Sequence, residues 1–202
     1  MMVRDVRTIE KAIRNEIIIQ KSRFITLLYP IQSKDEVLSL LQSSKNEYRN
    51  ATHYCYAYMI DNIAHCSDDG EPSKTAGMPM LNVLQGNQLD HILAITIRYF
   101  GGIKLGAGGL VRAYSNSVSK ALENATITEY TPGIEISITF PYSEVKQVDY
   151  ILQHQNIIKK EYNKDITYIV QMNHESFSDI QKRLKIQNIN IKIIKEVYVE
   201  KK

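Results

Sequence analysis

Glycine and cationic residues are concentrated in one segment, residues 98–114, with the sequence R-Y-F-G-G-I-K-L-G-A-G-G-L-V-R-A-Y. It holds five of the chain's nine glycines, at Gly101, Gly102, Gly106, Gly108 and Gly109. Because glycine has no Cβ atom, it permits positive φ angles and close approach of the backbone to a neighbour or ligand. Three cations lie among them, Arg98, Lys104 and Arg112. This combination favours anion binding by backbone N–H groups and cationic side chains at the start of a helix.

Two common phosphate loops do not fit this segment. Gly101 and Gly106 have the Walker A spacing, but Ala107 and Gly108 stand where that loop requires Lys followed by Ser or Thr. The dinucleotide fingerprint fails as well, because position 111 is Val. Two interpretations therefore stay open: the glycine N–H groups contact phosphate or nucleic acid, or the glycines let the following helix approach a sheet closely.

A second candidate segment, residues 66–81, has the sequence C-S-D-D-G-E-P-S-K-T-A-G-M-P-M-L. Its glycine and first proline predict a turn. The turn carries three carboxylates, Asp68, Asp69 and Glu71. They could hold Mg²⁺, or act as acid and base against the cations of the glycine segment. They could equally form a salt-bridged loop, and no nucleophile with a paired base is evident, so both interpretations remain.

A β-hairpin is predicted over residues 53–68, with Asp61 and Asn62 as its two-residue turn. In this register Ala57 faces Cys66, and one face of the ribbon carries His53, Cys55, Cys66 and Asp68. These residues are a conceivable zinc set, but they lack the C-x-x-C or H-x-x-x-H spacing of closed zinc sites. Reduced cysteines buried in a strand are common, so we predict neither metal nor cofactor.

The other face of the same ribbon carries four rings, Tyr54, Tyr56, Tyr58 and His65. Alternating aromatic side chains on a sheet can stack unpaired bases. They can also pack beneath a helix with their hydroxyl groups at its rim, and we favour this second interpretation.

The chain of 202 residues has an ordinary composition, with 44% hydrophobic and 23% charged residues. Its 25 basic and 22 acidic side chains give a formal charge of +3, too balanced to predict binding along duplex DNA or to an anionic membrane. We see no apolar run long enough to span a membrane and no apolar signal-peptide core. We expect a cytoplasmic protein with no membrane partner and only local basic sites. The oligomeric state is not predicted.

Periodicity predicts an α+β domain in residues 1–130. Strands are expected at 16–20, 23–29 and 92–98, beside the hairpin, and a short helix at 78–84. Ser33 and Glu36 form a capping box that begins another helix. A long helix is expected at 107–123, with its apolar positions at Leu110, Val111, Tyr114, Val118, Ala121 and Leu122.

Thr131, Pro132 and Gly133 interrupt the pattern, and we place a second domain at residues 131–202. Strands are expected at 134–140, 157–162, 166–172 and 191–199, and helices at 143–154 and 176–187, the second with an S-x-x-D cap from Ser176. The order βαββαβ is the ferredoxin-like arrangement.

Three motifs closely resemble signatures of the YigZ/IMPACT family, the former UPF0029 group. They are H-x-C-x-A-Y from His53, S-D-D-G-E-P-S-x-T-A-G from Ser67, and the glycine segment from Arg98. The resemblance implies a first domain with the left-handed βαβ ribosomal-protein domain 2-like fold, shared with a translocation elongation factor and GHMP kinases. The βαββαβ tail is similar to the extra C-terminal domain of bacterial members and to the elongation factor's fifth domain.

This resemblance implies a translation-associated regulator that binds RNA, the ribosome or a ribosome-associated protein. Eukaryotic members inhibit the amino-acid-starvation kinase pathway by competing for its ribosome-associated activator. No catalytic mechanism comes with the family, and we predict no catalytic residue. The rival hypothesis is an enzyme acting on a small phosphorylated or nucleotide substrate in the same cleft. Lys74 departs from the motif, which usually has Gly there, and Met78 often has Arg as its counterpart.

The resemblance also indicates which residues to expect at the site. We expect nucleic-acid or phosphate contacts from Arg98, Gly101, Gly102, Lys104, Gly106, Gly108, Gly109, Arg112 and Lys74. We expect the remaining motif residues to share one surface with them: His53, Asp68, Asp69, Glu71, Thr75, Tyr99 and Tyr114. In this arrangement the cations would meet phosphates, and Asp69 or Glu71 would orient them.

Overall fold

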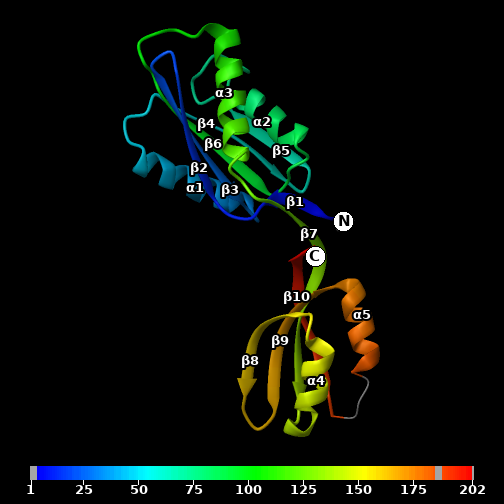
Figure 1. Ribbon diagram of the computed structural model, residues 1–202. Coiled ribbons are helices and arrows are strands. Elements are labelled where there is room, and N and C mark those ends of the chain that lie inside the picture. Colours follow the sequence, from blue (N-terminus) through cyan, green and yellow to red (C-terminus); the bar gives the residue numbers. More distant parts are fainter. Residues whose placement is uncertain (1–3, 185–187, 202) are drawn as a thin grey trace. The chain divides into compact units, whose positions relative to one another are not determined.

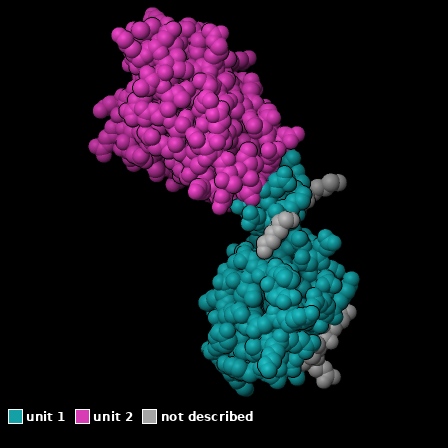
Figure 2. Space-filling model, in the orientation of Figure 1, with its two compact units in different colours: residues 1–5, 129–202 teal, residues 6–128 magenta. Residues whose placement is uncertain are grey.

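The computed structural model describes residues 4–184 and 188–201. The chain forms two compact units (Figure 2). One is Val6–Thr128, which we call the N-terminal unit, and the other is Glu129–Lys202 together with Met1–Asp5, which we call the C-terminal unit. Each has its own hydrophobic core, so each is described by itself.

The N-terminal unit is built on an antiparallel sheet. Its strands are β2 (Ile13–Ile19), β3 (Ser22–Pro30), β4 (His53–Ile60), β5 (Ile63–Ser67) and β6 (Ile92–Tyr99), and the short strand β1 (Val6–Ile9) precedes them. The sheet order is β2-β3-β6-β4-β5. The middle strand β6 is buried from Ile92 to Arg98, as its nearly continuous apolar sequence predicts for a strand between two layers.

Helices cover both faces of this sheet (Figure 1). They are α1 (Lys34–Glu47), α2 (Gly77–Gly86) and α3 (Gly106–Leu122). On one face the core contains Val37 of α1 packed with Tyr58, and Tyr54 and Tyr56 lie against it. The prediction that this face packs under a helix is confirmed for the three tyrosines, whereas His65 is exposed. On the other face, α2 and α3 cover a core that includes Cys55.

Local sequence signals account for several of these elements. The predicted Ser33 cap is present, since the Ser33 hydroxyl accepts from the Glu36 N–H, but the Glu36 carboxylate accepts from the Gln32 N–H and not from that of Ser33, as a full capping box requires. The hairpin turn has φ angles of 50° at Asp61 and 64° at Asn62, as a tight two-residue turn requires.

The predicted hairpin register is confirmed, with Ala57 opposite Cys66. One expected core position of α3 is wrong, because Val111 is 37% exposed. The helix faces its core with Ala113 and Ser117 instead, because these two positions lie one turn apart on the same side as Tyr114.

The C-terminal unit has the predicted βαββαβ order. Its elements are β7 (Ile127–Phe140), α4 (Val145–Leu152), β8 (Asn156–Tyr162), β9 (Ile166–Asn173), α5 (His174–Arg183) and β10 (Asn190–Glu200), with one 3-10 turn (Tyr142–Glu144) before α4. Within this unit the strand order is β10-β7-β9-β8, all antiparallel. This is the ferredoxin-like arrangement, and the α+β class predicted for the chain is confirmed.

Two local predictions in this region are wrong. The expected interruption at residues 131–133 lies inside β7. Gly133 continues the strand because a Cβ atom there would lie 2.3 Å from the Met172 carbonyl oxygen, so only glycine permits this approach of β9. Helix α5 begins at His174, and Asn173, not Ser176, is its cap: the Asn173 side chain accepts from the Ser176 N–H at 2.7 Å. Residues 185–187 of the predicted helix lie outside the described residues.

Among residues 4–184 and 188–201, no helix is both long enough and apolar enough to cross a bilayer.

Candidate functional site

A buried ion pair joins the acidic turn to the middle of the sheet. The Arg98 guanidinium lies 2.6 Å from the Glu71 carboxylate, and the two side chains are 6% and 3% exposed. The Tyr114 hydroxyl of α3 donates to the same Glu71 oxygen at 2.8 Å. Glu71 therefore bonds to β6 and α3 at once, and a buried charge held in this way is compensated rather than available to a ligand.

Cys55 and His53 extend this network from β4. The Cys55 thiol donates to the Asp68 carbonyl at 3.0 Å and to the Tyr114 hydroxyl at 3.3 Å. Burial raises the pKa of the Cys55 thiol and that of the Tyr114 hydroxyl, so both stay protonated donors at neutral pH. His53 Nδ1 donates to the Asp69 carbonyl at 2.8 Å, and its Nε2 lies 3.9 Å from Glu71.

The zinc set considered for the hairpin is not formed. Within the described chain, no three His, Cys, Asp or Glu side chains are grouped in a way that could hold a metal ion. The Asp68 carboxylate is directed elsewhere, since it accepts from the backbone N–H groups of Lys74, Ala76 and Gly77 at 2.8 to 2.9 Å.

Asp68 therefore fixes the start of α2. Burial raises the pKa of its carboxyl group, but the backbone N–H groups of Lys74, Gly77 and Ala76 together outweigh burial and leave it below the ordinary value of 3.8. Lys74 lies in this turn with φ of 61°, in the left-handed region that favours glycine. The motif that this segment resembles has Gly here, a residue type that adopts such a φ without strain.

The rest of the acidic turn is also occupied by internal bonds. The Asp69 carboxylate accepts from the Tyr54 N–H at 2.7 Å, and the Thr75 hydroxyl donates to the Pro72 carbonyl at 2.6 Å. Of the two interpretations of the carboxylates, this geometry agrees with the salt-bridged loop. The partners are Arg98 and backbone N–H groups, and not Lys104 or Arg112.

The glycine loop, residues 100–106, leaves β6 and leads into α3. A Cβ atom at Gly101 would lie 2.0 Å from the Lys21 carbonyl carbon, so this glycine permits backbone contact with the β2–β3 turn. Gly102 and Gly106 have φ angles of 85° and 69°, which other residues adopt only with strain. Gly101 thus permits a close backbone contact, but with the β2–β3 turn. A Cβ atom at Gly106, Gly108 or Gly109 would meet no atom of the sheet, so the predicted role of the glycines in packing the helix on the sheet is not seen.

The start of α3 has the features of an anion site. Leu105 is its N-cap residue and makes no side-chain capping bond, and the first turn contains no acidic residue. Gly106 and Gly108 are exposed, so their backbone lies open to solvent. The Arg112 guanidinium reaches back over this turn, 3.8 Å from where a Gly108 Cβ would be. Backbone N–H groups, the helix dipole and a cation thus favour a bound anion here.

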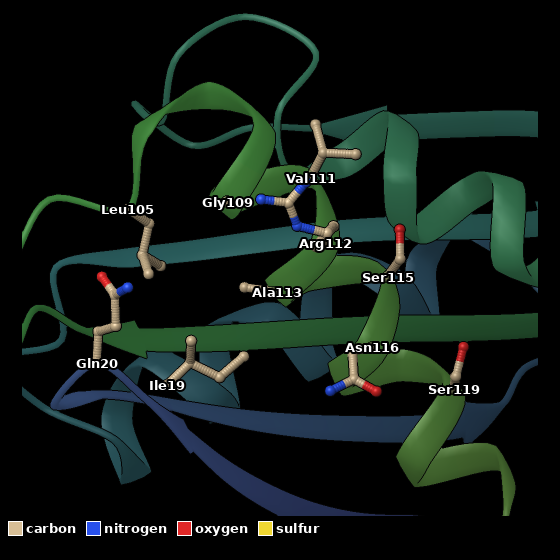
Figure 3. Close-up of a pocket in the computed structure, with 10 residues that line it drawn as sticks. All are labelled: Ile19, Gln20, Leu105, Gly109, Val111, Arg112, Ala113, Ser115, Asn116 and Ser119. Atoms are coloured by element: carbon tan, nitrogen blue, oxygen red, sulfur yellow. The ribbon is translucent and has the colours of Figure 1, made fainter.

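A shallow pocket of about 630 Å³ lies beside this helix start (Figure 3). Residues of α3 and of the β2–β3 turn line it, among them Arg112, Ser115, Asn116, Ser119 and Gln20. Its lining contains hydroxyl, amide and guanidinium groups but no carboxylate. It can therefore bind an anion, but it lacks a general base for acid–base chemistry.

The motif residues were expected to share one surface, but they do not form one exposed surface. Four of them, Glu71, Thr75, Arg98 and Tyr114, are buried. The reason is that a buried arginine needs its partners inside, so the whole network is internal. The Tyr99 hydroxyl lies apart and donates to the Arg49 carbonyl at 3.2 Å.

The exposed cations of the predicted set are Lys74, Lys104 and Arg112. None of the three makes an ion pair within the part of the chain that the structure describes. They are the side chains of the predicted set that remain able to meet phosphate.

Sequence reasoning missed three residues at this site. Ser22 accepts from Arg98 at 3.3 Å and from the Gly101 N–H at 3.2 Å, and Thr52 accepts from the Phe100 N–H at 3.0 Å. The Phe100 side chain is 46% exposed at the start of the glycine loop. Small hydroxyl residues in strands and loops carry no pattern that predicts their partners, whereas Phe100 could have been found as an aromatic residue next to two glycines.

Comparison with known proteins places these features in a family. The model of the Impact N-terminal domain matches residues 20–122, which include the buried network and the glycine loop. IMPACT family member YvyE of Bacillus subtilis is 37% identical over 208 residues, covering 99% of this chain and 96% of that protein. IMPACT family member YigZ of Escherichia coli is 38% identical over 139 residues, covering 66% of this chain and 68% of that protein.

A solved structure has a fold similar to that of this chain. A crystal structure described as that of a hypothetical protein matches with a TM-score of 0.68 and 28% sequence identity, covering 96% of this chain and 99% of that one.

Proposed function

The chain belongs to the IMPACT family, and from this membership we propose that it is a translation-associated regulator that binds RNA through the start of α3. The link to translation comes from the family. The chemistry of contact comes from the exposed cations Lys74, Lys104 and Arg112 and from the backbone N–H groups of the first turn of α3, which no side chain caps. The occupant would be the phosphate backbone of RNA, presented by the ribosome or by a ribosome-bound complex.

The observation that carries this proposal is the uncapped start of α3. A helix of 17 residues begins there without a capping side chain and without a carboxylate in its first turn. Residues 98–122 contain no acidic residue, and Lys104 and Arg112 are exposed cations near this helix start. An anion is therefore attracted by the helix dipole, by N–H donors and by side-chain charge together.

The proposed contact with RNA is weak, because it involves few phosphate groups. Three phosphate contacts to single-stranded RNA give a slope of about 2 for log K against log salt. Binding of this strength favours a larger assembly, in which other contacts add to it, over free RNA as the partner.

The rival hypothesis, an enzyme acting on a small phosphorylated substrate, is less well supported. Glu71 is sequestered with Arg98, Asp69 accepts from a backbone N–H group, and the pocket beside α3 has no carboxylate in its lining. Ser115 and Ser119 supply hydroxyl groups there, but no base is bonded to either. This arrangement favours binding over turnover.

The test is sedimentation of cell lysate through sucrose gradients in low and moderate salt. We expect the native chain to comigrate with ribosomal subunits in low salt and to be released by salt. The variant Lys104→Ala/Arg112→Ala should stay at the top of the gradient. The control Lys34→Ala/Lys120→Ala removes the same charge from the start of α1 and the last turn of α3, and it should behave as the native chain does.

Comigration that resists salt, or that persists in the Lys104→Ala/Arg112→Ala variant, would place the contact elsewhere. A native chain that stays at the top in low salt would overturn the translation proposal and favour the small-molecule hypothesis.

A further inference from the structure

We propose that Phe100 is a stacking platform for one unpaired RNA base at the entrance of the glycine loop. This inference rests on the proposed function and makes it more specific, since it adds base contact to phosphate contact. It concerns a side chain outside the set of expected site residues, and it starts from the buried network that holds Phe100.

The ring of Phe100 lies on a buried cation. The Arg98 guanidinium carbon is 5.4 Å from the centroid of the Phe100 ring and 5.4 Å from that of the Phe24 ring. Phe24 is fully buried, whereas Phe100 is 46% exposed. One cation therefore contacts two rings, of which one belongs to the core and the other is open to solvent.

The position of Phe100 is fixed from several directions. Its N–H donates to the Thr52 hydroxyl at 3.0 Å, and the Thr52 N–H donates to the Arg98 carbonyl at 2.8 Å. Arg98 itself is held by Glu71 at 2.6 Å. The next residue, Gly101, donates to Ser22 and contacts the backbone of Lys21. These bonds fix the backbone at Phe100, and the Arg98 contact orients its ring, so the ring loses little conformational entropy when a ligand covers it.

The electrostatics favour a base of a nucleic acid. The Arg98 guanidinium lies over the Phe100 ring, and the exposed part of the ring can stack on any base, since every base has a π-face. Lys21 and Lys104 are exposed beside the loop, and neither forms an ion pair among the described residues. Aromatic platforms flanked by cations are the usual means of binding single strands.

The experiment measures binding of short oligonucleotides to the full chain by fluorescence anisotropy in low salt. The probes are a labelled 12-mer of adenylate and the same 12-mer with abasic sugars, which keeps the phosphates and removes the bases. We expect Phe100→Leu to weaken binding of the adenylate 12-mer about 10-fold, because leucine cannot stack on a base as the aromatic ring does. It should leave the abasic probe and the salt slope unchanged.

The variant Lys104→Ala/Arg112→Ala gives the opposite pattern. It should weaken both probes and lower the salt slope, because it removes phosphate contacts and leaves the ring in place.

A second readout does not depend on the folding of Phe100→Leu. The chain contains no tryptophan, so Phe100→Trp introduces a single indole. We expect the adenylate 12-mer to quench its fluorescence and the abasic probe not to do so. Affinity of this variant should equal or exceed that of the native chain, because the aromatic platform is retained.

The outcomes separate the two proposals. Equal binding of both probes, unaffected by Phe100→Leu and without quenching of Phe100→Trp, would overturn the base platform and leave the phosphate proposal standing. No binding of either probe, together with loss of ribosome comigration in Phe100→Leu, would overturn the platform in favour of a protein contact. No binding of either probe and no comigration of the native chain would overturn the RNA proposal itself.

Discussion

At the scale of single residues, the Glu71 and Arg98 ion pair is the strongest constraint on the N-terminal unit. Glu71→Gln would leave the Arg98 charge buried without a counter-charge, because the guanidinium is 6% exposed. We expect a loss of about 3–5 kcal/mol in the free energy of unfolding, measured by urea denaturation. The double variant Glu71→Gln/Arg98→Met should lose less than the sum of its two single variants. Additive losses would contradict the pair as a coupled unit.

A second prediction concerns Asp68 and the dependence of stability on pH. Its folded pKa lies below the ordinary value of 3.8, so its stabilising effect is complete above that value and is lost as pH falls through the folded pKa. Asp68→Asn should therefore cost about 2 kcal/mol at pH 7, since an amide can accept fewer of the three backbone N–H groups. Urea denaturation at a series of pH values from 7 downward should show the difference from the native chain shrinking below about pH 4. A difference that is constant with pH would refute the role of the carboxylate charge.

Residue types predicted which side chains would be important, but not their surroundings. The motifs named Glu71, Arg98 and Tyr114, yet the sequence could not show that all three are buried together. A cation next to glycines is typical of an anion site, and only the position of Glu71 in space shows that Arg98 is already neutralised. Asp68 was considered as a metal ligand because it lies in the acidic turn and on one ribbon face with two cysteines. Its actual role could not be predicted, because its backbone N–H donors follow it by six to nine positions, a spacing that no common pattern describes.

At the scale of elements, two glycines of the same segment should respond in opposite ways to alanine. Gly101→Ala would place a Cβ atom 2.0 Å from the Lys21 backbone, so the β2–β3 turn or the glycine loop must move. We expect a loss of several kcal/mol, on the order of 3. Gly108→Ala lies in α3 with only the flexible Arg112 side chain near, and it should stabilise the chain by about 0.5–1 kcal/mol.

Thermal unfolding of both variants measures the difference. Gly108→Ala keeps its backbone N–H, so it should also keep its binding to the abasic probe. If Gly101→Ala were as stable as the native chain, the contact with the β2–β3 turn would not require glycine.

Secondary structure was largely predictable at this scale, because most elements carry a local signal. Ser33 caps the start of α1, and Asp61 with Asn62 makes a tight turn. The errors occurred where a distant contact outweighed the local signal. Gly133 suggested an interruption between elements, but because it has no side chain it lets β9 approach, and β7 continues through it. The motif indicated Ser176 as the cap of α5, but Asn173, three residues earlier, is the cap.

At the scale of the whole molecule, the two units have separate cores. Leu84 belongs to the core between the sheet and α2 and α3, and Ile138 belongs to the core of the C-terminal unit, and both are fully buried. Replacing either by Ala leaves a cavity that costs about 2–5 kcal/mol, or very roughly 8–20 °C in the Tm of the affected unit. Because each buried cluster of the described residues lies within one unit, each substitution should act on its own unit.

Differential scanning calorimetry of the full chain measures this directly. We expect two transitions, with Leu84→Ala lowering one and Ile138→Ala lowering the other. Ribosome comigration below the first transition should survive Ile138→Ala if the start of α3 alone makes the contact. A single transition lowered by both variants would mean that the units unfold as one. If Ile138→Ala lost comigration while the transition of the N-terminal unit stayed unchanged, the C-terminal unit would also contribute to binding.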